Sequence, residues 1–125
     1  MVPSWIRALL VANGVYDLVL GAAFLVAGAR MYDAMGVTPP NHWGYVQFPA
    51  ALVAVFGAAF LVAARAPGRH RDIVAMGVFL KLAYAGVVLG HMFKGSVPAL
   101  WTVFGWIDLL MALLLAAAWS TLAKR

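Results

Sequence analysis

The chain has 125 residues, of which 66% are hydrophobic and only 10% are charged. A soluble domain is roughly half apolar and about a quarter charged, so this composition excludes an ordinary soluble fold. The formal net charge is +5 and there is no cysteine, which excludes disulfides, thiolate metal sites and cysteine-based catalysis.

The first apolar run, residues 5–28, is long enough to cross a membrane, which takes about 20 residues. A cleaved signal peptide is the competing interpretation, but the run is too long for one and carries Asp17 at its centre. At about 100° per residue, Asp17 shares a helix face with Gly14, Gly21 and Gly28. Small residues let helices approach closely in lipid, so these glycines are predicted to pack against another helix.

Residues 29–46 form the longest predicted connection, with a short helical turn expected over residues 30–36. The second apolar run, residues 47–64, carries no charge. Pro49 is expected in its first turn, where a missing N–H does little harm. Three residues at four-residue spacing are predicted to pack against another helix, with Gly57 alongside them: Ala50, Ala54 and Ala58.

The third run, residues 73–93, carries Lys81 at its centre, and Asp72 is predicted to cap its first turn. A charge at that depth costs roughly 2.5–3.5 kcal/mol on insertion scales, so Lys81 should have partners. The fourth run, residues 99–122, carries Asp108 near its middle. The chain is therefore predicted to be a single all-α membrane domain, residues 1–125, with four spans in one bundle.

The distribution of basic residues predicts the orientation of the bundle. With an even number of spans, both termini and the 65–72 turn lie on one side of the membrane. Two basic residues fall on the other side, Arg30 and Lys94. The side of the termini holds the larger set: Arg7, Arg65, Arg69, Arg71, Lys124 and Arg125. An excess of Lys and Arg marks the cytoplasmic side, so both termini are predicted to be cytoplasmic.

The ionisable residues Asp17, Lys81 and Asp108 lie at similar depths, and the simplest arrangement turns all three inward. Two carboxylates beside one ammonium leave a surplus negative charge, which predicts that one carboxyl holds or shares a proton. Three further polar residues are expected to complete the hydrogen bonding: Asn13, Tyr16 and Tyr84. Two interpretations stay open: a structural joint that fixes which helix faces meet, or a proton or ion relay.

A second cluster of candidate residues lies near the outer side: His42, His91 and Met92, with Met31 and Met35. Imidazole and thioether groups suit Cu(I), but methionine is also an ordinary core residue and histidine an ordinary interfacial one. The prediction is therefore that no metal and no cofactor is bound. The sequence has no HExxH motif, phosphate-binding glycine loop or nucleophile elbow, so a conventional enzyme is not expected.

Several segments resemble those of small bacterial four-helix inner-membrane proteins of unknown function. They are NGVYDLVLG, PPNHWGYVQFPA, GVFLKLAYAGVVLGHMFKGSVPALW and FGWIDLLMALLLAAAW. The general layout is also loosely similar to DoxX-like proteins. The resemblance implies a four-helix architecture and a bacterial inner-membrane location, and it implies no particular activity.

The leading functional expectation is a small non-catalytic membrane protein, a structural or accessory subunit. It would lie in the lipid bilayer and pack with itself or with a larger membrane complex, and it would bind no nucleic acid. The alternative is an oligomeric proton-coupled transporter or channel that uses Asp17, Lys81 and Asp108. Four helices of this size rarely enclose a pore, so transport would need a dimer or a larger assembly. The third alternative is a redox- or quinone-associated accessory protein.

Overall fold

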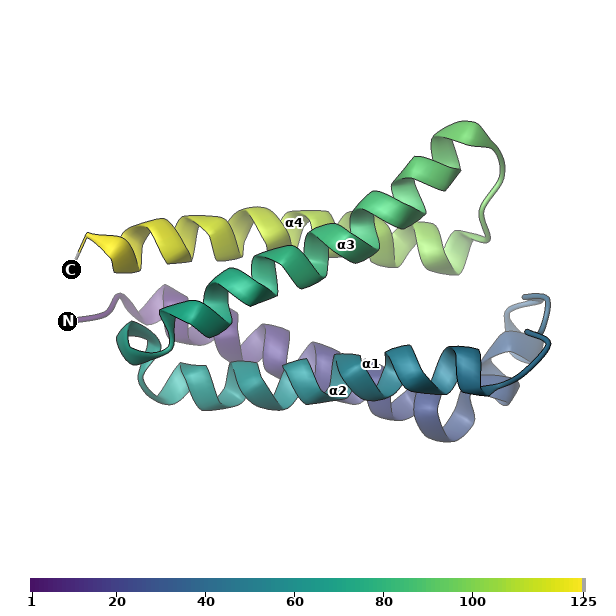
Figure 1. Cartoon of the computed structure of the whole chain (residues 1–125), viewed down its shortest axis with the longest axis horizontal. Coiled ribbons are helices and arrows are strands. Elements are labelled where there is room, and N and C mark those ends of the chain that lie inside the picture. Colours follow the sequence, from purple (N-terminus) through teal and green to yellow (C-terminus); the bar gives the residue numbers. More distant parts are fainter. Residues whose placement is uncertain (125) are drawn as a thin grey trace.

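The computed structural model describes residues 1–124 and consists of four long helices (Figure 1). The bounds are Ser4–Ala34 for α1, Gly44–Arg65 for α2, Arg71–Lys94 for α3 and Ala99–Ala123 for α4. A short 3-10 turn, η1 (Pro67–Arg69), connects α2 to α3. Each of the four helices is long and apolar enough to cross a membrane, so the prediction of four apolar helices is confirmed.

Helix α1 extends beyond the predicted apolar run. It continues to Ala34, with a kink at Ala27 (φ −123°, ψ 21°), where a separate short turn was expected after residue 28. The helix continues because residues 29–34 include alanine, arginine and methionine, which favour helix regardless of hydropathy. It ends in a Schellman motif: Gly36 adopts φ +65° and the Val37 N–H donates to the Tyr32 carbonyl at 2.9 Å.

Two local predictions about helix starts are wrong. Helix α2 begins at Gly44, so Pro49 lies inside the helix rather than in its first turn. Pro49 therefore has no N–H to donate to the carbonyl of Tyr45, four residues earlier. Helix α3 begins at Arg71, so Asp72 lies in the first turn and is not the cap. Its Oδ1 accepts a hydrogen bond from the adjacent Ile73 N–H at 2.9 Å, which removes it from the capping geometry.

The four helices form two antiparallel pairs, α1 with α2 and α3 with α4, and each pair packs far more closely within itself than against the other. Both chain ends and η1 lie at one end of the bundle, which we call the terminal end (Figure 1). The α1–α2 and α3–α4 connections lie at the opposite end, the loop end, where α3 leans away from α1 and α2 (Figure 1).

Glycines bring the α1 and α2 backbones into direct contact. A Cβ atom at Gly21 would lie 2.5 Å from the carbonyl oxygen of Ala50, and one at Gly57 would lie 2.5 Å from the amide nitrogen of Leu18. A Cβ atom at Gly14 would lie 2.7 Å from the Leu61 side chain and 2.9 Å from the Gly57 carbonyl oxygen. No side chain larger than hydrogen fits at these places without moving the helices apart.

The predicted packing residues do not all face the partner helix. Gly14, Gly21 and Ala50 are buried at the α1–α2 contact, and Ala54 lies beside Gly21. Ala58 is exposed, and Gly57 takes the position toward α1. The physical reason is the helical period: a seven-residue step from Ala50 returns almost to the same face, whereas two four-residue steps rotate about 80° away. Gly28 is buried, but a Cβ atom there would lie 3.7 Å from its nearest contact, the Val46 side chain, which is an ordinary van der Waals distance.

Arginines tie each pair together at the terminal end. Arg7 on α1 donates from Nη1 to the carbonyl oxygens of Ala64 and Arg65, at 3.0 and 2.9 Å, where the last carbonyls of α2 lack helical partners. Arg71 on α3 donates from Nε to the Trp119 carbonyl at 3.3 Å, and its guanidinium lies 3.8 Å from the Trp119 ring centroid. Both contacts lie within a pair, so they do not join the two pairs.

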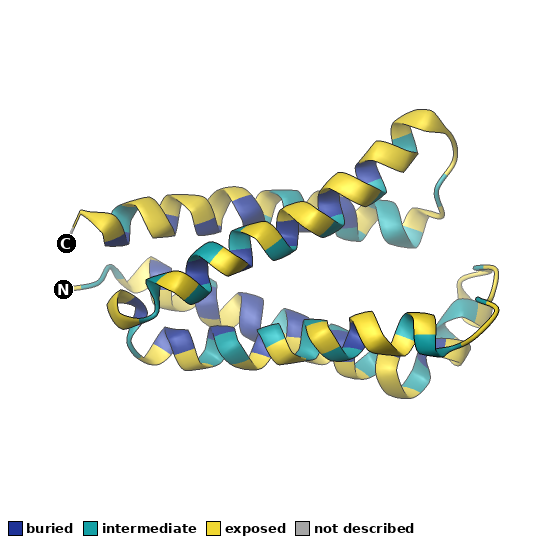
Figure 2. Ribbon diagram, viewed as in Figure 1, coloured by how far each residue is buried: buried dark blue, intermediate teal, exposed yellow. Residues whose placement is uncertain are grey.

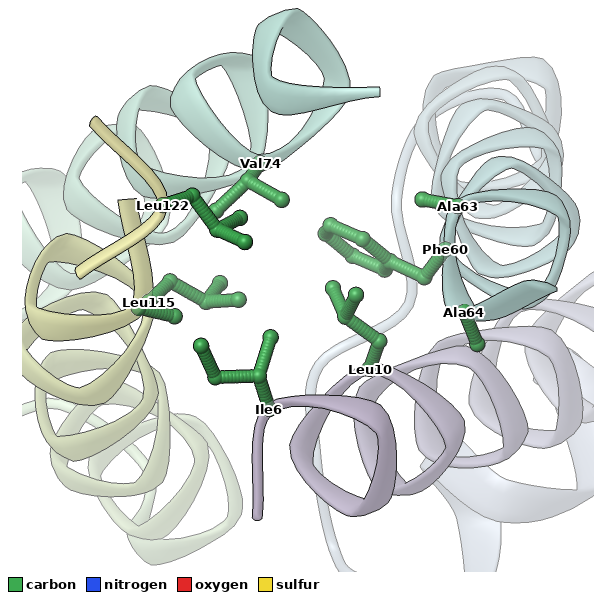
Figure 3. Packing of buried hydrophobic residues seen from close by; sticks show 9 residues of the cluster. Ile6, Leu10, Phe60, Ala63, Ala64, Val74, Leu115 and Leu122 are labelled. Atoms are coloured by element: carbon green, nitrogen blue, oxygen red, sulfur yellow. The ribbon is translucent and has the colours of Figure 1, made fainter. Parts of the chain in front are cut away.

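The two pairs meet at the terminal end through one cluster of buried apolar side chains, which we call the terminal cluster (Figure 3). The Phe60 ring contacts Gly77 of the other pair closely, and no larger residue could stand at Gly77 without moving the ring. Residues from all four helices belong to the cluster: Ile6, Leu10, Phe60, Ala63, Ala64, Val74, Leu115, Ala118 and Leu122.

Residues turned away from the bundle are largely apolar as well. Figure 2 shows burial confined to the inward faces of the helices, with exposed residues along the outward faces. Large apolar side chains occupy these outward faces on every helix, for example Val19, Val55, Phe79 and Leu113. Such extensive exposed apolar surface is unusual for a soluble monomer.

Candidate functional site

The structure brings Asp17, Lys81 and Asp108 together, and we call them the ionic triad. The Lys81 Nζ lies 2.6 Å from Asp17 Oδ1 and 3.6 Å from Asp108 Oδ1. The side chains of Lys81 and Asp17 are only 1% and 3% exposed, and that of Asp108 is 12% exposed. Because Asp17 is on α1 and Lys81 is on α3, their ion pair crosses between the two helix pairs. With all three groups ionised, the triad carries one surplus negative charge.

Each member of the triad continues the buried stripe of its own helix. Lys81 stands one turn from Gly77 and one turn from Ala85, both buried on the same face of α3. Asp108 stands between Gly105 and Ala112 on α4 in the same way. Small residues above and below leave room for the polar side chains at the centre of the bundle. The long aliphatic stem of Lys81 fills that space and delivers its ammonium to the carboxylates.

The three residues expected to complete the hydrogen bonding do not reach the carboxylates. Asn13 donates from Nδ2 to the Leu9 carbonyl at 3.0 Å and to the Met111 sulfur at 3.4 Å. The Tyr84 hydroxyl donates to the Trp101 carbonyl at 3.4 Å. This expectation is therefore wrong for both residues, because backbone carbonyls lie closer to their donors.

Tyr16 contributes its ring rather than its hydroxyl. The Lys81 ammonium lies 5.1 Å from the ring centroid of Tyr16, within the range of a cation–π contact. The buried Tyr16 hydroxyl makes no hydrogen bond within the described chain, and neither do two buried acceptors, Asn13 Oδ1 and Asp17 Oδ2. A buried polar atom without a partner costs about 1–3 kcal/mol, so two acceptors near the triad are left with unused capacity.

A cavity of about 320 Å³ extends from the ionic triad between the two helix pairs. Its α1 and α4 linings run from the triad toward the loop end, through Phe24 and Tyr32 of α1 and through Trp101 and Phe104 of α4. All four helices contribute, and the remaining lining is mostly apolar: Leu20, Gly21, Tyr45, Val46, Pro49, Ala50, Val53, Leu80 and Tyr84. The triad is therefore the charged base of an otherwise apolar and aromatic cavity.

The aromatic wall is a connected set of rings from three parts of the chain. The centroid of the Trp101 ring lies 5.6 Å from those of both Phe24 and Tyr32. Tyr32 in turn contacts Trp43 at 5.1 Å and near-perpendicular planes, the edge-to-face geometry that aromatic pairs prefer. Phe104 completes the wall, with its ring 6.4 Å from that of Phe24.

The sequence places Phe24 on the face of Asp17 and Trp101 on the face of Asp108, but no aromatic wall was predicted from it. Phe24 is seven residues after Asp17, and Phe104 and Trp101 are four and seven residues before Asp108, so all three share a face with their aspartate. That spacing was available as a signal. No such spacing pointed to Tyr32, because this residue lies on the part of α1 that continues beyond the apolar run.

The outer histidine residues lie in different helix pairs. His42 is exposed in the α1–α2 connection, where its Nδ1 accepts a hydrogen bond from the Gly44 N–H at 2.9 Å. His91 is exposed and Met92 is partly exposed near the end of α3, in the other helix pair. Between Met1 and Lys124, no three histidine or acidic side chains are grouped closely enough to hold a metal ion.

The chemistry available in this site is ionic and hydrogen bonding rather than nucleophilic. The carboxylates can accept a proton or a hydrogen bond, and the ammonium of Lys81 can follow whichever carboxylate is ionised. The aromatic wall can hold an apolar group beside them. No protein-family model, curated protein or solved structure matches this chain.

Proposed function

We propose that this chain is a multi-pass membrane protein that binds a small molecule in the cavity between its helix pairs and takes part in moving it across the membrane. One observation carries the proposal: the ionic triad lines a cavity of about 320 Å³ instead of being sealed in close packing. A joint that only fixes which helix faces meet needs no such space beside it. Small-molecule sites typically have volumes of about 300–1,000 Å³, mostly apolar linings and a few convergent polar groups.

The proposed membrane placement rests on the outward faces and on the basic residues. Apolar outward faces suit lipid, and the four helices have the length to span it. The terminal end carries most of the basic residues, which supports cytoplasmic termini. The bacterial inner membrane is proposed from the sequence resemblance alone.

The ion pair between Asp17 and Lys81 suggests how binding is coupled to movement. It crosses between the helix pairs at the level where the terminal cluster ends and the cavity begins. A proton or a ligand that competes for Asp17 would weaken this link. Toward the loop end the two pairs meet through ring contacts such as Phe24 with Trp101, so a separation of the pairs there would break these contacts. Movement across the whole membrane would need a second copy or a larger assembly.

Proteoliposomes with an imposed pH gradient test this function. We expect proton flux with the unaltered protein and its loss in Asp108→Asn and Lys81→Met. The matched controls are Asp72→Asn and Lys94→Met, which make the same chemical changes at exposed positions outside the cavity. Equal flux in the triad variants and the controls, or no flux with folded unaltered protein, would contradict the transport proposal.

The non-catalytic accessory subunit is the second candidate. The burial of Asn13, Asp17 and Lys81 at 0–2% favours it, because groups so enclosed also specify which helix faces meet. Native mass spectrometry after gentle solubilisation separates the two. A stoichiometric protein partner that is lost in Lys81→Met, together with no flux, would support the accessory subunit. A bound small molecule without a protein partner would support the transporter.

A further inference from the structure

We propose that the ligand of this cavity is a lipophilic organic amine in its protonated form, an ammonium group on an apolar or aromatic tail. This inference rests on the proposed binding function and adds the chemical class of the ligand. Its basis is the contrast between the two parts of the cavity. The base has a surplus of hydrogen-bond acceptors and of negative charge, and the walls are aromatic.

The charge of the base selects against anions. Lys81 is the only cation among the residues that line the cavity, and it faces two carboxylates. Its ammonium is already committed, with Asp17 Oδ1 at 2.6 Å, Asp108 Oδ1 at 3.6 Å and the Tyr16 ring beneath it. With both carboxylates ionised, a ligand carboxylate or phosphate would meet a site whose net charge is negative.

The free hydrogen-bonding capacity of the base also selects for a donor. Asp17 Oδ2 is buried and has no hydrogen-bond partner within residues 1–124, whereas Oδ1 accepts a hydrogen bond from Lys81 Nζ at 2.6 Å. A ligand that brings N–H groups would satisfy the Asp17 acceptor, whereas a ligand anion would face two carboxylates.

The walls suit the remainder of such a ligand. Aromatic faces attract cations through their quadrupoles, most strongly at tryptophan. Phe24, Tyr32, Trp101 and Phe104 form a continuous aromatic wall that leads to Asp108. An ammonium at the base and an apolar tail along this wall would use both parts of the cavity at once. A small inorganic cation would use the base and leave the wall without a role.

Three probes that carry a phenyl ring on a short alkyl chain test the class: phenylbutylammonium, phenylbutyl alcohol and phenylbutyrate. Binding is measured by calorimetry on the full chain in phosphatidylcholine nanodiscs, with empty nanodiscs as the blank. We expect saturable binding of the ammonium at least about tenfold tighter than that of the alcohol, and no binding of phenylbutyrate. Equal or tighter binding of the alcohol or the carboxylate overturns the ammonium class while keeping a binding cavity. Binding of none of the three overturns the proposed function itself.

Variants test whether Asp108 and Trp101 cause the preference for an ammonium ligand. Asp108→Asn keeps the 2.6 Å pair of Lys81 with Asp17, so it should fold, and it removes the surplus charge. We expect it to weaken ammonium binding about tenfold and to leave alcohol binding nearly unchanged. Trp101→Leu should weaken both probes. Asp72→Asn, the matched charge change outside the cavity, should alter neither. An ammonium preference that survives intact in folded Asp108→Asn would refute the assignment.

The ammonium group could come from a free amine or from a lipid, since both carry the same chemistry. Repeating the titration in nanodiscs that also contain phosphatidylethanolamine separates the sources. Unchanged probe affinity assigns the site to free amines. Competition by phosphatidylethanolamine in the unaltered protein, lost in Asp108→Asn, assigns it to the lipid ammonium.

Discussion

The terminal end and the loop end of this bundle use the same four helices in opposite ways. At the terminal end the large ring of Phe60 faces Gly77, so the helix pairs interlock and the space between them is filled. Toward the loop end large residues face large residues, as with Phe24 and Trp101, and a cavity remains between the pairs. Complementary sizes close an interface, whereas bulky groups on both sides hold the helices apart.

The ionic triad lies at the boundary between these two ends, and its disruption should have the largest effect on stability. Lys81→Met leaves two buried carboxylates without their counter-ion. Removing one partner of a buried pair costs about 3–5 kcal/mol. We expect a loss of that size in the free energy of unfolding, measured by SDS titration in mixed micelles.

A second variant isolates the ion pair from the loss of the lysine side chain. Asp17→Asn combined with Lys81→Met removes both charges of the 2.6 Å pair and leaves only Asp108. The double variant should recover part of the stability lost in Lys81→Met, because no uncompensated charge remains at Asp17. If it is as unstable as the sum of the two single variants, the pair is not the link between the helix pairs.

The next largest effect is expected in the terminal cluster. Phe60→Ala removes a fully buried ring from the contact with Gly77, and such truncations cost about 3–5 kcal/mol in well-packed cores. The same unfolding titration should show a loss near the lower bound, about 3 kcal/mol, because lipid is as apolar as the cluster. Phe79→Ala on the outward face of α3 is the matched control, since that ring is 65% exposed. Similar losses in both variants would show that the cluster is not closely packed.

The positions of the helices were predictable from the sequence because apolar runs of this length have few alternative structures. Their ends were less predictable, since hydropathy follows the thickness of a membrane whereas helix ends follow local caps. Helix α1 ends at Ala34, six residues beyond the apolar run, and is followed by Gly36 with its positive φ. At the start of α2, the Gly44 N–H donates to His42 Nδ1. The prediction of which residues face the partner helix was also approximate. Four-residue spacing selected Ala58, but the helical period places Gly57 against α1.

Part of the site was also predictable from the sequence and part was not. Depth along the helices suggested that Asp17, Lys81 and Asp108 share one level, because a charge in an apolar span needs a partner. The cavity could not be read from depth, since it depends on how far apart the two helix pairs stand. That separation is set by side-chain volumes across the pairs, such as Phe24 against Trp101, and a single sequence does not show which residues will face one another.

A substitution at the contact within a helix pair should have an intermediate effect on the free energy of unfolding. At Gly21 a valine would place its Cβ 2.5 Å from the Ala50 carbonyl oxygen and 2.6 Å from the Ala54 amide nitrogen. Overpacking of this kind costs about 1–3 kcal/mol, and backbone atoms cannot move aside as a side chain can. We therefore expect Gly21→Val to lose about 2 kcal/mol in unfolding. Gly86→Val is the control, since nothing lies within 4 Å of a Cβ there. An equal loss at Gly86 would assign the effect to the valine rather than to the contact.

The smallest effect on stability is expected at the aromatic wall, in Trp101→Leu. Trp101 is partly exposed and borders the cavity, so a smaller side chain there enlarges a space that already exists instead of creating one. The ring contacts with Phe24 and Tyr32 are lost, and part of that loss is offset by the apolar leucine, which gives a net loss of about 1 kcal/mol. Phe60→Ala and Trp101→Leu thus both truncate an aromatic ring, one at each end of the bundle. If unfolding titrations give equal losses for the two, then the loop end is as closely packed as the terminal end and the cavity is not a standing feature of the fold. A clearly smaller loss for Trp101→Leu, together with weaker binding of phenylbutyl probes, would show that this wall serves the ligand more than the fold.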